Sequence, residues 1–164
     1  MGKIYKGLTN LEIIGIAIRS EMEAASFYRD FADRVDNPLV KAKFKTLAAE
    51  EGKHAKMLRE LYEQLSGGDK PRPPKGWKAS LPPEFGPEAP MEDLLREAIA
   101  MEKRAQVAYR TAAGRSSDTK ARMMLEYLVE FERGHQRLLE GELKFLERNP
   151  EWFEEPWHDV HVGP

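Results

Sequence analysis

The stretches Glu51-Gly52-Lys53-His54 and Glu132-Arg133-Gly134-His135 share the spacing Glu-x-x-His at two places in this 164-residue sequence. Three residues along an α-helix correspond to about 300° of rotation, so the glutamate and the histidine point to one side, roughly one turn apart. A single metal ion can contact both side chains. One such pair is common in charged helices, whereas two at matched positions are a specific indication of a metal site.

The two stretches belong to an internal repeat. A shift of 81 residues overlays segments 9–65 and 90–146 without a gap, and 13 of the 57 residue pairs are identical. The identical pairs that carry chemical information are Glu21/Glu102, Ala24/Ala105, Tyr28/Tyr109, Glu51/Glu132 and His54/His135. The repeat indicates that one helical hairpin occurs twice in the chain.

Apolar residues recur at helical spacing in four segments. The predicted helices span about 11–35, 38–65, 91–114 and 119–148. Thr9 and Glu12 have the spacing of a capping box at the start of the first helix. Asn37 and Pro38 are suited to begin the second helix, and Gly67 to end it. A short turn joins the helices within each half, so each half should be an antiparallel hairpin.

The connection between the two hairpins, residues 66–90, contains seven of the eleven prolines and four of the twelve glycines, so it should not be helical. One long crossover between two hairpins is the connectivity of ferritin-like bundles. We predict an all-α, antiparallel four-helix bundle of ferritin-like type over residues 1–148, with its crossover loop at 66–90 and a C-terminal tail at 149–164. A flexible linker between two independent hairpins is the alternative, but a lone hairpin buries too little apolar surface.

Four glutamates interrupt the apolar faces of these helices: Glu21, Glu51, Glu102 and Glu132. Their neighbours at three, four and seven positions are mostly apolar or aromatic, so each carboxylate lies where the core should be. An isolated buried carboxylate costs several kcal/mol or takes up a proton. Each glutamate also lies 13 or 14 residues from the turn of its hairpin, or about 20 Å, so all four should meet at one level.

Charge balance predicts what occupies this level. Four carboxylates bring a charge of −4, neutral imidazoles bring none, and two divalent cations bring +4. The predicted metal ligands, which would also be the catalytic residues, are Glu21, Glu51, His54, Glu102, Glu132 and His135. We expect two iron ions, with manganese or zinc as alternatives. The neighbouring Glu23, Glu50 and Glu130 should be solvated, and the competing interpretation is that all these groups form surface salt bridges.

Composition excludes several other classes of protein. The sequence has no cysteine, which excludes disulfides, iron–sulfur clusters, thiolate zinc sites and a cysteine nucleophile. Its 26 Lys and Arg residues nearly balance 28 Asp and Glu residues, which argues against nucleic acid as a partner. The longest apolar stretch, Ile13 to Ile18, is too short to span a bilayer, and the N-terminus lacks a signal-peptide pattern. We therefore expect a cytoplasmic protein with no membrane partner.

At these residues the sequence resembles the rubrerythrin branch of the ferritin-like superfamily, over about residues 9–148. The resemblance is carried by Glu21-x-x-Ala24-x-x-x-Tyr28, by its repeat around Glu102, and by the two Glu-x-x-His pairs. It implies that the six residues are metal ligands and that some of the carboxylates bridge two metals. Tyr28 and Tyr109 would either hydrogen-bond to groups around the metals or only fill the core.

Three features depart from the relatives. Rubrerythrins proper carry a cysteine-ligated rubredoxin domain, so a chain without cysteine should need an external electron donor. They also carry an additional glutamate where this chain has Ala105, so the resemblance does not extend to their asymmetric peroxide site. Bacterioferritins bind haem through a methionine beside the ligands of the second helix. Gly52 stands after Glu51 here, so no haem is expected.

The resemblance implies a redox enzyme in which ferrous iron reduces hydrogen peroxide or dioxygen. The alternatives are ferritin-like iron oxidation and storage, hydroxylation of an organic substrate, and a metal-binding scaffold or sensor without turnover. We expect a homo-oligomer, with a dimer favoured over the hollow cage that storage needs. In the tail, His158 and His161 could form an accessory metal site, while Trp152, Phe153 and Trp157 should pack against the bundle or a partner subunit.

Overall fold

The computed structural model describes residues 5–72, 74 and 85–154 of the chain. These residues form four α-helices and no β-strand. The helices are α1 (Asn10–Arg34), α2 (Pro38–Ser66), α3 (Met91–Arg115) and α4 (Thr119–Arg148). Every helix begins and ends within one residue of the bounds predicted from the apolar pattern.

Local contacts explain where the first two helices begin and end. The Thr9 hydroxyl accepts a hydrogen bond from the Glu12 N–H at 3.2 Å, and the Glu12 carboxylate accepts one from the Thr9 N–H at 2.7 Å, which completes the predicted capping box. The Asn37 side chain accepts from two N–H groups in the first turn of α2, and Pro38 occupies the first helical position. Gly67 ends α2 at a φ of 77°, which glycine adopts without strain.

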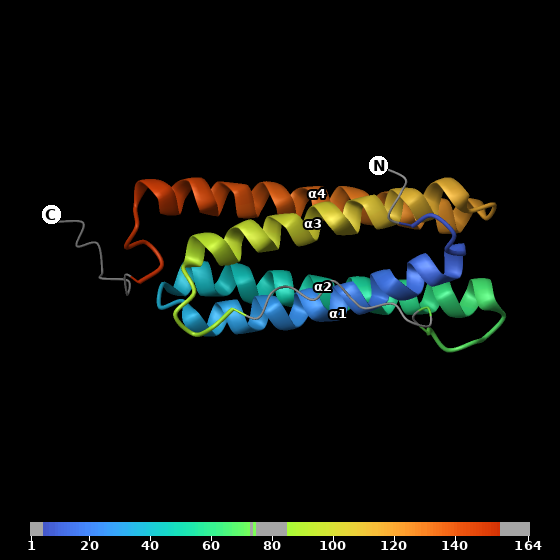
Figure 1. The fold of residues 1–164 in the computed structure, drawn as a ribbon, viewed down its shortest axis with the longest axis horizontal. Coiled ribbons are helices and arrows are strands. Elements are labelled where there is room, and N and C mark those ends of the chain that lie inside the picture. Colours follow the sequence, from blue (N-terminus) through green and yellow to red (C-terminus); the bar gives the residue numbers. More distant parts are fainter. Residues whose placement is uncertain (1–4, 73, 75–84, 155–164) are drawn as a thin grey trace, which may run out of the picture.

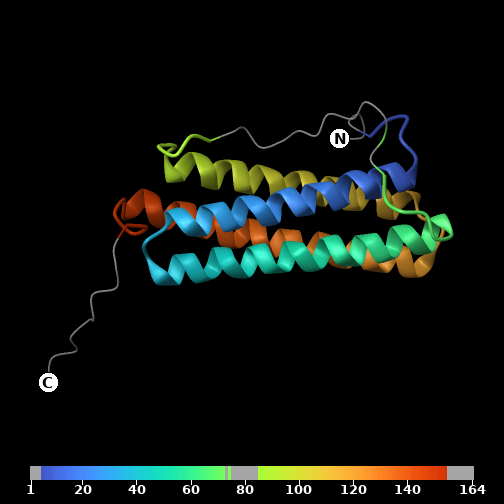
Figure 2. The same cartoon turned by 90° about the horizontal axis from the view of Figure 1, so that it is seen from below.

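The helices are arranged as two antiparallel hairpins, α1 with α2 and α3 with α4 (Figure 1). α1 lies against α3 between the hairpins, whereas α2 and α4 approach each other less closely. α2 ends at one end of the bundle and α3 begins at the other, so the two ends of their connection lie at opposite ends of the bundle (Figure 2). This is the predicted connectivity. Residues 73 and 75–84 of the connection lie outside the described residues.

The buried apolar side chains form two clusters along the bundle. One cluster, which includes Ile14, Leu58 and Leu125, occupies the half in which α1 begins and α2 ends. The other occupies the half that contains the α1–α2 turn, where Phe31 and Phe44 stack with their ring centroids 3.9 Å apart. The repeated glutamates and histidines form a polar layer between the two clusters.

The chain after α4 returns to the bundle at the α1–α2 turn. Phe153 is 1% exposed and packs against Phe31, with the ring centroids 6.1 Å apart. The Phe153 carbonyl accepts hydrogen bonds from the N–H groups of Asp36 and Asn37 at 3.0 and 3.1 Å. The predicted packing of this aromatic side chain against the bundle is thereby confirmed.

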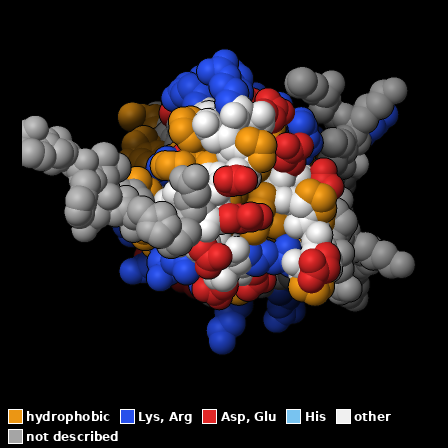
Figure 3. Space-filling view, turned by 90° about the vertical axis from the view of Figure 1, so that its left-hand side faces the viewer, with side chains coloured by type: hydrophobic (Ala, Val, Ile, Leu, Met, Phe, Trp, Pro, Cys, Tyr) orange, Lys and Arg blue, Asp and Glu red, His pale blue; other side chains and the backbone are white. Residues whose placement is uncertain are grey.

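The last residues of the tail, 155–164, lie outside the described residues, so the accessory site at His158 and His161 stays a prediction, as does the packing of Trp157. Acidic and basic side chains both occur on the end of the bundle that carries the α1–α2 turn (Figure 3). Among the described helices, none is both long enough and apolar enough to cross a membrane.

Replacing Phe153 by alanine should lower the free energy of unfolding by about 3 kcal/mol, because the substitution leaves a cavity beside Phe31. Thermal or urea unfolding followed by circular dichroism measures this change. Leu39→Ala is the matched control, since Leu39 is 45% exposed and its truncation should cost less than about 1 kcal/mol. Equal, small effects of the two substitutions would show that Phe153 is not held against the bundle in solution.

Candidate metal centre

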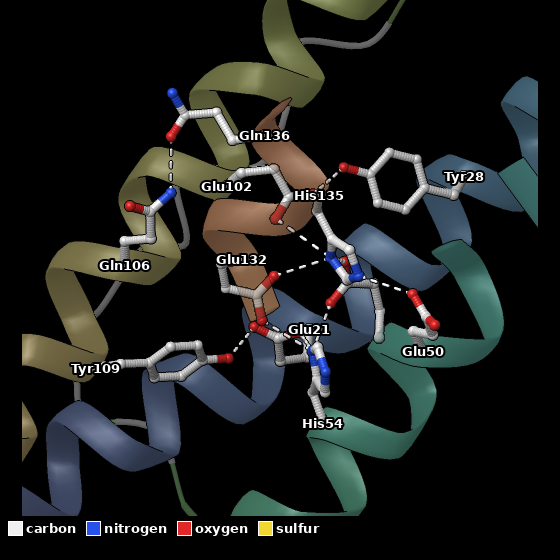
Figure 4. Close-up of polar contacts among 11 residues, drawn as sticks. Glu21, Tyr28, Glu50, His54, Glu102, Gln106, Tyr109, Glu132, His135 and Gln136 are labelled. Atoms are coloured by element: carbon white, nitrogen blue, oxygen red, sulfur yellow. Dashed lines mark hydrogen bonds and ion pairs between the residues drawn. The ribbon is translucent and has the colours of Figure 1, made fainter. Parts of the chain in front are cut away.

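The polar layer brings the six predicted residues together from all four helices (Figure 4). The contributing residues are Glu21 of α1, Glu51 and His54 of α2, Glu102 of α3, and Glu132 and His135 of α4. The glutamates are 0–2% exposed and the histidines 4 and 5%. The equal distances from the hairpin turns therefore place all six side chains at one level, as the sequence predicted.

Three carboxylates surround the Nδ1 atom of His54. This nitrogen lies 2.8 Å from Glu132 Oε1, 3.1 Å from Glu51 Oε2 and 3.6 Å from Glu21 Oε2. One of these carboxylates comes from the same helix one turn earlier, and the other two come from α1 and α4. The imidazole therefore joins three helices of the bundle.

The surroundings of His135 Nδ1 repeat this arrangement. Its distances are 2.9 Å to Glu51 Oε1, 3.0 Å to Glu132 Oε2 and 3.7 Å to Glu102 Oε2. Glu51 and Glu132 thus contact both histidines with different oxygens, whereas the two remaining glutamates contact one histidine each. A Glu from each of two helices and a Glu-x-x-His pair from each of the other two is the ligand arrangement of dinuclear carboxylate sites in helical bundles.

The layer contains more hydrogen-bond acceptors than donors. An Nδ1 atom carries at most one hydrogen, yet three carboxylates face each one. Three buried oxygens consequently lack a hydrogen-bond partner of acceptable geometry: Glu21 Oε2, Glu51 Oε1 and Glu132 Oε1. Four of the residues, Glu51, His54, Glu132 and His135, each offer one ligand atom, and these four atoms all lie within 4.8 Å of one another. These residues could therefore hold a metal ion. Mixed imidazole and carboxylate ligands suit iron or manganese.

Two tyrosines connect the hairpins through the unshared glutamates. Tyr28 of α1 donates a hydrogen bond to Glu102 of α3, and Tyr109 of α3 donates one to Glu21 of α1. Both rings are fully buried. In each carboxylate one oxygen accepts from the tyrosine and the other points to a histidine. Of the two roles that the sequence left open for the tyrosines, hydrogen bonding around the site is confirmed.

Burial controls the protonation of the unshared glutamates in the metal-free layer. It raises the pKa of Glu21 and of Glu102 well above the usual range, and the negative charge of Glu51 raises both pKa values further. Burial also raises the pKa of Tyr28 and Tyr109. These four groups therefore hold their protons to a higher pH than the same side chains do in water.

The shared glutamates and the histidines are charged in the metal-free layer. Burial alone would raise the pKa of Glu51 and Glu132, but hydrogen bonds from the histidines and from the protonated carboxyls outweigh it and lower both. Burial alone would lower the pKa of His54, but the three carboxylates around its Nδ1 favour the charged ring and raise the pKa to about 12. The pKa of His135 is raised for the same reason.

With Glu21 and Glu102 protonated, the net charge of the metal-free layer is zero, because two carboxylates balance two imidazolium groups. Two divalent cations would give the same total with four carboxylates and two neutral imidazoles. Four protons and two divalent cations are thus equivalent ways to neutralise the layer, and binding the cations requires the protons to leave.

The structure differs from the sequence-based expectation at Glu50, which was predicted to be solvated. Its Oε2 lies 2.8 Å from Nε2 of His135, on the side of the imidazole opposite Nδ1 (Figure 4). Glu130 does pair with Arg133 on the surface, at 2.6 Å, and Glu23 pairs with Arg19 at 2.8 Å. The position of Glu50 directly before a predicted ligand was the only signal in the sequence, and it does not reveal a contact with another helix.

Comparison with known proteins gives one family match, to the rubrerythrin family model over residues 12–143. This chain belongs to the rubrerythrin family. Proteins with curated functions give no match.

Solved structures resemble the chain over most of its length. A hypothetical protein from Pyrococcus furiosus is 30% identical with a TM-score of 0.78, over 88% of this chain and 96% of that one. A Rhodobacter capsulatus bacterioferritin with a metal-free dinuclear site and haem iron is 23% identical (TM-score 0.72, 94% and 96%). A manganese catalase from Anabaena is 22% identical (TM-score 0.66, 96% and 81%). The last two show that the fold is ferritin-like.

Metal binding should release protons at neutral pH, up to four per chain, since His54 and His135 must each lose one and Glu21 and Glu102 lose any that they hold. Calorimetric titration of the metal-free protein with Mn²⁺, in buffers that differ in ionisation enthalpy, counts these protons. Release of none would contradict the charge assignment.

The same groups predict how stability depends on pH without metal. Folding raises the pKa values of these groups. Their contribution to the free energy of unfolding is therefore fully present below their pKa values in the unfolded chain, and it is lost as pH rises through their pKa values in the folded protein. The metal-free protein should therefore become less stable as pH rises above about 6.5, the ordinary pKa of histidine, toward about 12, the pKa of His54 in the folded protein, and Mn²⁺ should stabilise it more at the higher pH. Thermal unfolding with and without EDTA measures both trends; a metal-free protein that gains stability over this range would contradict them.

Proposed function

We propose that this chain binds two iron ions in the polar layer. Their oxidation would reduce hydrogen peroxide or dioxygen. The observation that supports the proposal is the burial of four carboxylates and two imidazoles at one level with more acceptors than donors. The proposed ligands and catalytic residues are Glu21, Glu51, His54, Glu102, Glu132 and His135. Manganese or zinc would fit the same donor atoms.

Bound ferrous ions would supply the two electrons that, with two protons, convert one hydrogen peroxide molecule to two water molecules. The residues of the chain prepare the site for this chemistry. The apolar clusters on both sides limit access of bulk water, and Tyr28 and Tyr109 fix the orientation of the unshared carboxylates. The chain has no cysteine, so we propose an external electron donor. Peroxide removal in the cytoplasm, as a defence against oxidative stress, would be the cellular role.

Ferroxidase activity and iron handling is the second candidate, and Ala105 favours it. Rubrerythrins proper carry a glutamate at this place, so the ligand set proposed here resembles the symmetrical one of six residues in bacterioferritins. We propose a homo-oligomer, in particular a dimer; a cage in size-exclusion chromatography with light scattering would support storage instead. A metal-binding protein without turnover is the remaining alternative.

Anaerobic titration with ferrous iron, followed by hydrogen peroxide or air, tests the proposal. We expect two irons per chain and a rapid rise in near-ultraviolet absorbance upon oxidation. Faster oxidation by peroxide would support peroxide reduction, and faster oxidation by dioxygen would support the ferroxidase alternative. Absence of any oxidation would leave the protein as a metal-binding scaffold.

A double variant with Glu51→Ala and His135→Ala should lose stoichiometric iron binding, because the remaining four ligands cannot complete two sites. The matched control is Glu130→Gln, since Glu130 is an exposed carboxylate two residues before a proposed ligand and should leave binding unchanged. Iron binding that survives in the double variant would overturn the proposed site.

A further inference from the structure

The two halves of the metal centre differ at one pair of repeat-related positions. Residue 50 is a glutamate, whereas the residue 81 positions later is Phe131. Each of these side chains lies beside the histidine of the opposite hairpin. Glu50 of α2 contacts His135 of α4, and Phe131 of α4 contacts His54 of α2. The two imidazoles therefore have equivalent carboxylates at Nδ1 but different surroundings at the rest of the ring.

On one side of the site a carboxylate supports the imidazole. Glu50 Oε2 lies 2.8 Å from His135 Nε2, and the Glu50 side chain is 34% exposed while that of His135 is 6% exposed. When Nε2 donates its hydrogen to a carboxylate, the lone pair of Nδ1 is directed at the metal position and becomes more basic. Such outer partners also hold the ring in the orientation that the metal needs.

On the other side an aromatic ring takes this place. The rings of Phe131 and His54 meet edge to face, with their centroids 5.4 Å apart and an interplanar angle of 76°. Phe131 also faces the His135 ring at the longer centroid distance of 6.5 Å. Over residues 5–72, 74 and 85–154, no carboxylate lies within ion-pair distance of His54 Nε2. The Phe131 side chain restricts rotation of the His54 imidazole by contact. It has no carboxylate that could accept a hydrogen bond from Nε2 of His54.

We infer that Glu50 is a positioning residue that makes the two metal positions unequal, so that the position beside His135 binds a divalent cation more tightly and fills before the position beside His54. The inference rests on the proposed dinuclear site and adds an order of filling to it. The shared carboxylates contact both histidines at nearly the same distances, so they do not create this difference.

Co²⁺ alone is a suitable probe, because it can be added to the metal-free full-length chain and located in crystals by anomalous scattering. With one equivalent of Co²⁺, the anomalous peak beside His135 should be clearly stronger than the peak beside His54. A titration followed by the visible absorption of bound Co²⁺ should show a tighter and a weaker step.

Four substitutions separate positioning from a general structural effect. Glu50→Ala should weaken the His135 position about 10-fold to 100-fold and leave the His54 position unchanged, so the peaks become equal or reverse. Glu50→Gln keeps an acceptor without the charge and should lose less. Phe131→Glu should strengthen the His54 position. Glu130→Gln should change neither position, since the Glu130 carboxylate pairs with Arg133 on the surface. Thermal unfolding of the metal-free variants verifies that each one folds.

Equal anomalous peaks in the wild-type protein, or equal weakening of both positions by Glu50→Ala, would overturn the inference while leaving the dinuclear site intact. Absence of stoichiometric Co²⁺ binding to the wild-type chain would instead refute the site and the inference together.

Discussion

Four carboxylates buried at one level of a helical bundle require a compensating positive charge, and the rest of the molecule is arranged around that requirement. Removing a single ionised carboxylate from water costs several kcal/mol even after the protein relaxes. The two apolar clusters make this cost unavoidable, because they separate the layer from solvent on both sides. Protons satisfy the requirement in the metal-free chain, and divalent cations satisfy it more specifically. The fold and its metal chemistry are therefore linked by electrostatics.

Most of this could be predicted from the sequence because it depends on regular spacing. The helix bounds follow from apolar periodicity and from the caps at Thr9, Asn37 and Gly67, and the common level of the ligands follows from equal distances to two short turns. The contact of Glu50 with His135 could not be predicted, because it joins residues 85 positions apart and depends on how α2 and α4 are rotated toward each other. The docking of Phe153 on the α1–α2 turn depends on the path of an irregular segment. That segment has no periodic spacing of apolar residues from which its path could be predicted.

Proteins that share this bundle at 22–23% identity include a bacterioferritin and a manganese catalase, so the fold does not determine a reaction. Differences in reaction must therefore come from the side chains that each protein adds to the fold. In this chain those groups are the tyrosines that cross between hairpins, Ala105 in place of an additional carboxylate, and the unequal pair at positions 50 and 131. They control orientation and access, which are the means by which a protein adjusts a metal centre.

The reciprocal hydrogen bonds of Tyr28 and Tyr109 show how the two hairpins are related by symmetry. Each hairpin supplies a tyrosine to the other and receives one in return, which is the relation between subunits in a two-fold symmetric dimer. Two copies of a single ancestral hairpin could have formed the same ligand layer, but symmetry would have required identical residues on both sides. Two hairpins within one chain are free of that requirement, so a glutamate can stand beside one histidine and a phenylalanine beside the other.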